Sequence, residues 1–304
     1  MKNEQKRNPA DIFFPLNNDD IVLYHYTSLE SLKSIVENNT LRFSDYRFVN
    51  DINEFSFCIE NLDRVLEEFN VEDVAPIKQV LNDLQNGRDL NFKIAGVNEN
   101  NQLYGYEQLD TDASFYIFSM TENDDSLNMW KMYSENGVRI KLNTKILHLF
   151  LRELQRKYLP LGIINIGNDR VNYDCNLEYE REIVSALIET NTNKVSPTLY
   201  DILFRLCILR KDVCFSYEKE YRIGFKFFDK LLIGNDTVRK VFITRNNTLI
   251  PQLEFSNVPI PDLIEDILIS PYNKSDRAVL GLKTFLKKYL DKDIDVRSSQ
   301  IKIR

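Results

Sequence analysis

Two short segments far apart in the chain carry residues that could do chemistry. In the first, His25 follows an apolar run at 21–23 that predicts a buried strand. Thr27 and Glu30 then have the spacing of a helix capping box. His25 would therefore stand between the end of a strand and the start of a helix. Ligands with anionic groups bind in such crevices, although a histidine whose hydrogen bonds are made within the fold would give the same pattern.

The second segment is 214–227, where residue types alternate. Period-two spacing predicts a strand with an apolar face and a polar face, and the polar face carries Glu218, Glu220, Arg222 and Lys226. Two carboxylates and an arginine would then line up on one side of the strand, as an active site could use. A solvent-facing strand of an antiparallel sheet would have the same pattern.

A middle block lies between these segments. Residues 113–121 predict a strand that contains Ser119, and a short helix follows with Met129, Trp130 and Tyr133 on one stripe. The stripe is typical of core packing or of a platform on which a ring could stack. Asn50 and Asp51 likewise fit the start of a helix or a ligand contact.

The remaining elements mix strands and helices without strict alternation, which favours an α+β fold. Residues 1–18 are polar and 88–112 predict a surface loop or lid. Helices are expected at 29–38, 55–69, 76–86, 144–157 (with His148 as a structural residue), 178–189, 199–210 and 275–290. Further strands are expected at 41–44, 161–166, 238–243, 249–253, 264–270 and 294–303.

Composition limits the function classes. The net charge of −7 argues against a non-specific nucleic-acid binder, and nine glycines leave no glycine-rich phosphate loop. The four cysteines lack zinc spacing, and Cys58 and Cys207 fall on apolar helical faces, so we expect buried thiols. No apolar run is long enough for a membrane span and no signal peptide is evident, which predicts a cytoplasmic protein with no membrane partner.

Several motifs, in order, resemble one bacterial family, domain-of-unknown-function family 2971. They are 24–27 (Tyr-His-Tyr-Thr), Phe118-Ser119, Trp130 with Tyr133, and 218–222 (Glu-Lys-Glu-Tyr-Arg). The layout more distantly resembles the ADP-ribosyltransferase fold, in which a histidine or arginine ends the first strand and a glutamate opens a late one. The resemblance implies a single α+β domain over 19–304, with helical insertions at about 52–110 and 144–212. Two small antiparallel or mixed sheets would form a cleft for NAD.

The resemblance also implies roles for individual residues. Glu220 would stabilise the oxocarbenium-like cation that forms as the nicotinamide–ribose bond breaks, and Glu218 would orient or deprotonate the acceptor. His25 would hold the adenosine ribose, and Ser119 would brace Glu220 or the ligand. Arg222 would pair with a carboxylate or bind a phosphate. Further cofactor contacts are expected from Tyr26, Thr27, Trp130 and Tyr133.

The function implied is an NAD-dependent ADP-ribosyltransferase, with NAD as substrate, no metal, and a protein or nucleic acid of unknown identity as acceptor. Bacterial proteins of this fold are often toxins or antiviral effectors, so the resemblance implies a toxin or anti-phage defence effector with an antitoxin or defence-system partner. Two alternatives remain open. One is an NAD glycohydrolase that uses water as acceptor, and the other is a non-catalytic module that senses a ligand or binds a protein.

Overall fold

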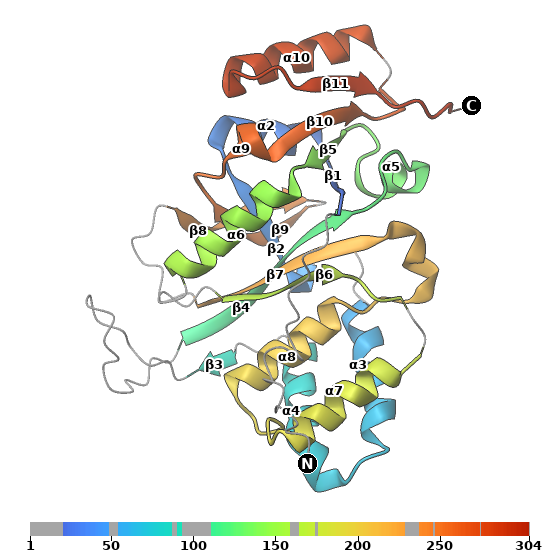
Figure 1. The fold of residues 1–304 in the computed structure, drawn as a ribbon, viewed down its shortest axis with the longest axis vertical. Coiled ribbons are helices and arrows are strands. Elements are labelled where there is room, and N and C mark those ends of the chain that lie inside the picture. The colour runs from blue at the N-terminus through green and yellow to red at the C-terminus, as the bar shows by residue number, and fades with distance from the viewer. Residues whose placement is uncertain are drawn as a thin grey trace, which may run out of the picture.

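The computed structural model describes residues 21–48, 54–86, 90–92, 111–158, 164–173, 176–228, 237–245, 247–273 and 275–303. Within these ranges, eleven strands join into one mixed sheet (Figure 1). They are β1 (Leu23–Thr27), β2 (Leu41–Asp45), β3 (Leu90–Phe92), β4 (Thr111–Thr121), β5 (Val138–Leu142), β6 (Ile164–Arg170), β7 (Glu220–Phe228), β8 (Val238–Arg245), β9 (Thr248–Phe255), β10 (Ile264–Ile269) and β11 (Asp295–Ser298). With the helices below, these strands confirm the α+β prediction.

Strand β4 is the branch point of this sheet. Along one edge it pairs with β7 from Ala113 to Thr121, and β7 pairs in turn with β6. Along the other edge it meets β2 at Tyr116 and Ile117 and meets β1 only at Thr121. One branch continues from β1 through β5, β10 and β11, and the other from β2 through β9 and β8. Two separate sheets were expected, but the shared strand β4 makes them branches of one sheet.

The main core lies between this sheet and helices from the beginning, middle and end of the chain. Side chains of β4 and β7 at alternate positions, such as Phe118, Met120 and Ile223, point into it. The helices that pack here are α2 (Leu29–Asn38), α6 (Thr144–Tyr158), α9 (Ile260–Leu263) and α10 (Asp276–Leu290).

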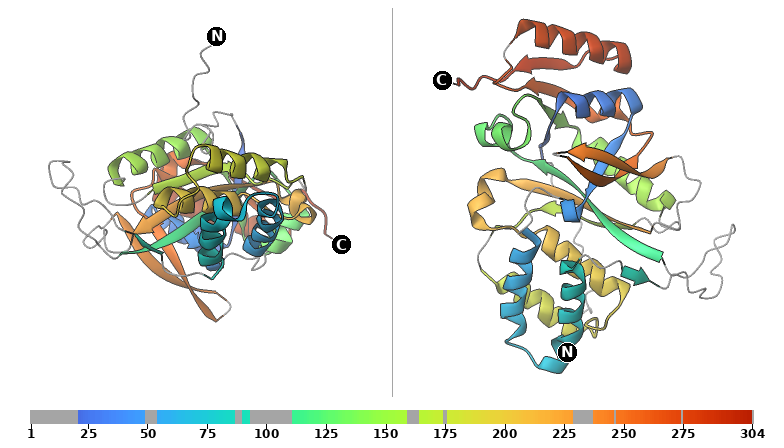
Figure 2. Two further views of the ribbon diagram at one scale, coloured as in Figure 1. Left: turned by 90° about the horizontal axis from the view of Figure 1, so that it is seen from below. Right: turned by 180° about the vertical axis from the view of Figure 1, so that it is seen from behind.

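A second core lies on the other face of β4 and is mostly helical. Phe115 and Ile117 point into it, because they alternate with the positions that face the main core. Its helices are α3 (Glu54–Leu66), α4 (Val71–Gln85), α7 (Glu178–Glu189) and α8 (Pro197–Ile208). They gather at one end of the molecule, opposite α10 (Figures 1 and 2). Both predicted insertions therefore contribute helices to one layer, while β6 of the second insertion pairs within the sheet.

Some element boundaries differ from the sequence predictions. The cap of α2 is Ser28, whose side chain accepts from the Ser31 N–H, because Thr27 is still part of β1. Helix α4 begins at Val71, one turn before Pro76, which lies inside the helix. Strand β11 covers only 295–298 of the predicted 294–303. The end of α2 agrees with prediction, since Asn39 adopts the left-handed conformation there.

Both expected buried thiols are buried: Cys58 and Cys207 have no exposed surface and lie in the second core. Asn50, Asp51 and most of 88–112 lie outside the described residues. None of the helices that the structure describes combines the length and the apolar character needed to span a bilayer.

Candidate functional site

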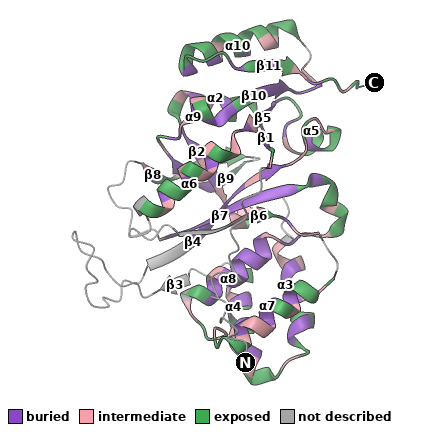
Figure 3. Ribbon diagram, in the orientation of Figure 1, coloured by how far each residue is buried: buried purple, intermediate pink, exposed green. Residues whose placement is uncertain are grey.

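The polar face of β7 lies inside the molecule. Glu220, Arg222 and Lys226 are only 8%, 3% and 1% exposed, and Figure 3 shows β7 in the colour of buried residues. Helix α8 covers this face. Lys226 Nζ lies 2.7 Å from Asp201 Oδ2, and Arg222 Nη1 donates to the Ile208 main-chain oxygen at 2.7 Å. The sequence left open a solvent-facing strand, and this burial excludes it.

Glu220 is held by three side chains. Arg222 makes a bidentate pair with it, with Nε 2.8 Å from Oε1 and Nη2 2.7 Å from Oε2. Lys211 Nζ lies 3.5 Å from Oε2, and the Ser119 side chain hydrogen-bonds the carboxylate. Burial alone would raise the pKa of Glu220, but these neighbours hold that pKa below its ordinary value. A negative charge is therefore fixed at the start of β7.

Glu218 joins the same cluster from outside the strand. A 3-10 helix ends at Glu218 and β7 begins only at Glu220, so Glu218 does not lie on the strand face as predicted. Lys211 Nζ lies 2.6 Å from Glu218 Oε2, and Tyr133 Oη donates to Oε1 at 2.8 Å. Lys219, between the glutamates, has a φ of 44°, in the left-handed region. This turn lets both carboxylates contact one ammonium group.

His25 reaches the cluster through Ser119. Its Nδ1 lies 3.0 Å from the Ser119 main-chain oxygen, and its ring stacks on Phe118 with 4.6 Å between centroids. The strand register puts the side chains of Ser119 and Glu220 on the helical face of the sheet and His25 on the main-core face. The two predicted site residues therefore lie on opposite faces and meet at Ser119, which offers its carbonyl to one and its hydroxyl to the other.

The contact with Ser119 also fixes the form of the imidazole. A carbonyl oxygen can only accept, so His25 Nδ1 must carry the proton. Burial lowers the pKa of His25, against a smaller opposite effect of the Ser119 hydrogen bond, so the ring is neutral at pH 7. In a neutral ring with the proton on Nδ1, Nε2 is an acceptor. His25 is of intermediate exposure in the structure.

The predicted aromatic contacts form a small core of their own around α5 (Leu127–Tyr133). Trp130 has no exposed surface, packs edge-on against Tyr26, and donates from Nε1 to Asp125 at 2.7 Å. The Trp130 ring therefore offers no surface to a ligand in this structure. Tyr26 is also buried, and its hydroxyl donates to the Asp124 main-chain oxygen at 2.5 Å. Of these rings, Tyr133 is the one that touches the carboxylate cluster.

Thr27 lies at the buried end of β1, where its main-chain oxygen accepts from the Ser134 hydroxyl at 2.7 Å. Gly137 packs against the same oxygen, and a Cβ at Gly137 would stand 2.1 Å from it. The chain can therefore close tightly here only with glycine at 137. Thr27 anchors the end of the strand that carries His25.

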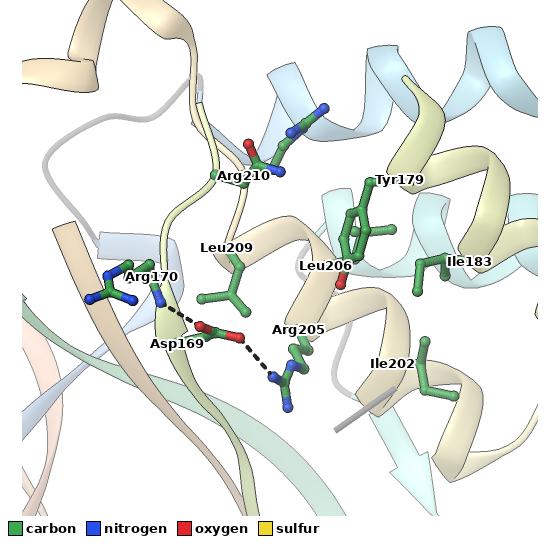
Figure 4. A pocket seen from close by; sticks show the side chains of 10 residues that line it. Asp169, Arg170, Tyr179, Ile183, Ile202, Arg205, Leu206, Leu209 and Arg210 are labelled. Carbon is green, nitrogen blue, oxygen red and sulfur yellow. Dashed lines mark hydrogen bonds and ion pairs between the residues drawn. The ribbon is translucent and has the colours of Figure 1, made fainter. Parts of the chain in front are cut away.

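A cavity of about 260 Å³ adjoins the cluster, between β6 and the helices α7 and α8 (Figure 4). Asp169 lies at its edge, opposite Arg222 in the pairing of β6 with β7, and accepts from Arg205 at 3.3 Å. Apolar side chains form most of the opposite wall, including Leu206 and Ile183. None of the predicted site residues lines this cavity.

With the geometry in place, comparison with known proteins gives one result. Residues 129–223 match the family model described as a protein of unknown function, DUF2971. The match spans a little under a third of the chain, contains Trp130, Tyr133 and the two glutamates with Arg222, and does not reach His25 or Ser119. It supports the resemblance to this family that the motifs predicted. No curated protein and no solved structure matches the chain.

Sequence reasoning missed two residues of the cluster, and both lie inside the DUF2971 match. Lys211 bonds to both carboxylates, although its position after an apolar helix gives it no distinguishing pattern. Tyr173 accepts the Glu220 main-chain N–H at 2.9 Å, and it follows β6 rather than any predicted motif. Only the pairing of β6 with β7 and the end of α8 bring these two residues to the site.

Proposed function

We propose that this protein binds NAD beside His25, Ser119 and Glu220 and transfers its ADP-ribose to an acceptor. The observation that carries the proposal is that His25 and Glu220, each about a hundred residues from Ser119 in the chain, both hydrogen-bond to Ser119: His25 to its main-chain oxygen and Glu220 to its side chain. An ADP-ribosyltransferase-like fold is part of this proposal, and its motivation is the order of His25, Ser119 and Glu220 along the chain.

The charges at the cluster suit the chemistry of this reaction. Breaking the nicotinamide–ribose bond builds positive charge on the ribose, and a fixed carboxylate stabilises that charge. Glu220 stays ionised among its donors. In the proposed complex a ribose hydroxyl donates to Glu220 Oε2, the oxygen that Lys211 Nζ contacts at 3.5 Å. His25 Nε2 accepts from the second ribose, while the nicotinamide leaves with the bonding electrons.

The test is transfer of label from radiolabelled NAD to a cell lysate by wild type, Glu220→Gln and Glu254→Gln. Glu254 is a matched control, because it is also a buried glutamate between two cations, Arg42 and Arg239, but lies on β9. Transfer by wild type and Glu254→Gln, with at least a hundredfold loss in folded Glu220→Gln, supports the proposal. Equal transfer by all three variants, or none by wild type, contradicts it. Release of nicotinamide without transfer would identify water as the acceptor.

A further inference from the structure

Lys211 is a buried cation with a position that neither the strand pattern nor the family motifs indicate. It follows α8, is 4% exposed, and its main-chain N–H donates to the Asn172 oxygen at 3.2 Å. Its ammonium lies 4.8 Å from the centre of the Phe215 ring. The backbone and the ammonium of Lys211 are therefore each held by a neighbour on another segment, which gives the ammonium a fixed place.

We propose that Lys211 is the positioning residue that holds Glu218 and Glu220 as a pair, with their carboxylates bridged by its ammonium. Only the effect of Lys211 on catalysis rests on the proposed function; the contacts of Lys211 with the two glutamates do not. The bridge itself stands on two distances, 2.6 Å to Glu218 Oε2 and 3.5 Å to Glu220 Oε2. In the described hydrogen bonds, Arg222 donates to Glu220 but not to Glu218. Lys211 is therefore the cation that joins the two glutamates in these contacts.

Electrostatics explains why such a pair needs the lysine. Two carboxylates that share a buried site repel each other, and one takes up a proton unless a cation lies between them. Glu218 and Glu220 carry two negative charges, and Lys211 and Arg222 carry two positive ones, so the charges of these four described residues balance when all are ionised. Removing Lys211 leaves one excess negative charge among these residues, on two glutamates whose side chains are almost fully buried (Glu218 is 1% and Glu220 is 8% exposed). The pair then binds a proton more readily.

The described polar groups around Glu220 determine how its protonation depends on pH. Arg222 comes from β7, Ser119 from β4, Lys211 from the segment after α8, Glu218 from the 3-10 helix, and Tyr173 from the segment after β6. Of these, only Lys211 contacts both carboxylates among the described hydrogen bonds. Its removal therefore changes the charge balance of the pair while the bidentate Arg222 contact remains.

The test compares Lys211→Met with Lys226→Met. Lys226 is the matched control, because it is equally buried and lies on the same face of β7, but pairs with Asp201 instead. In the pH profile of NAD turnover, Lys211→Met is expected to move the acid limb up by about one pH unit or more. Lys226→Met is expected to leave the limb in place, and Lys211→Arg to restore it in part. A uniform loss at every pH, with the limb unmoved, would overturn the inference.

A second readout needs no activity, so that the inference and the proposed function can fail separately. The carboxyl carbon of Glu220 is followed by NMR through a pH titration in ¹³C-glutamate protein, with Glu220→Gln for assignment. The pKa of Glu220 is expected to rise by about one unit or more in Lys211→Met and to stay in Lys226→Met. If the pKa of Glu220 is unchanged in Lys211→Met, the proposal that Lys211 bridges the two carboxylates is wrong, even if the protein turns over NAD. If the pKa of Glu220 shifts in Lys211→Met but the wild-type protein neither binds nor turns over NAD, the role of Lys211 is supported and the proposed transferase activity is rejected.

Discussion

At the scale of single residues, the start of β7 is a buried cluster in which the described charges of Glu218, Glu220, Lys211 and Arg222 balance. Removing one charged side chain from such a cluster lowers the free energy of unfolding by more than the intact cluster adds to it. The reason is that the partner's charge is then left buried and poorly solvated. Glu220 and Arg222 show this most simply, since they share two hydrogen bonds of 2.8 and 2.7 Å.

The first prediction concerns this pair. Arg222→Leu is expected to lower the free energy of unfolding by about 3–5 kcal/mol, because Glu220 is left with too little positive charge. The double variant Glu220→Leu with Arg222→Leu is expected to lose at least about 1 kcal/mol less than the sum of the single changes. Urea denaturation at pH 7 measures all three. Strict additivity would show that the two side chains do not act as a pair.

The second prediction is a pH dependence of stability that comes from His25. Its pKa in the folded protein is lowered by burial, below the ordinary value of 6.5, so the unfolded chain binds the proton more readily. This group's contribution to stability is therefore complete above 6.5 and is lost as the pH falls below that value. His148 acts in the same direction, because burial also lowers its pKa.

Urea denaturation between pH 7.5 and 5.5 checks this sign. The free energy of unfolding of wild type is expected to fall over this range, and that of His25→Asn to fall less. Asparagine is the suitable replacement, because its amide N–H can still donate to the Ser119 oxygen but it does not titrate. Equal slopes for the two proteins would mean that His25 keeps its ordinary pKa in the fold.

At the scale of elements, the junction between the 3-10 helix and β7 decides where the glutamates lie. Lys219 has a φ of 44° in this junction, and its own N–H donates to the Ser216 oxygen at 3.4 Å. A residue with a Cβ is strained in this conformation by about 1–2 kcal/mol, and a β-branched one more so. The exposed Lys219 side chain does not belong to the cluster, so the strain can be tested there alone.

The third prediction is that Lys219→Gly leaves the free energy of unfolding unchanged or raises it by up to about 1 kcal/mol, because glycine adopts positive φ freely. Lys219→Val is expected to lower it by at least about 1 kcal/mol. Thermal and urea unfolding of both variants measure the difference. If Val and Gly behaved alike, the left-handed turn would not be required at this position.

Many of the helices and strands can be predicted from the sequence, but the burial and the long-range contacts of the candidate site cannot. The periodicity of 113–121, 144–157 and 275–290 predicted β4, α6 and α10 closely, since local patterning determines such elements. The burial of Arg222 depends on α8, whose Ile208 carbonyl accepts from it across fourteen residues. The position of Lys211 depends on the pairing of β6 with β7. No local pattern carries these long-range contacts.

At the scale of the whole molecule, β4 joins the parts of the proposed site. On one edge it pairs with β7, which carries Glu220, and on the other it meets β1, which carries His25. The two predicted partners thus lie on opposite faces of the sheet, with Ser119 between them. The motif order alone could not show this, because the face of a residue depends on the register of its strand.

The most direct measurement of this account is calorimetric titration of NAD into wild type, His25→Asn and Glu254→Gln. His25→Asn can keep the bond to Ser119 but loses Nε2, so it is expected to fold normally and to bind NAD about tenfold more weakly or worse. Wild type and Glu254→Gln are expected to bind with equal affinity at one site. Absence of NAD binding by wild type, or equal binding by His25→Asn, would contradict an NAD site built on His25, Ser119 and Glu220.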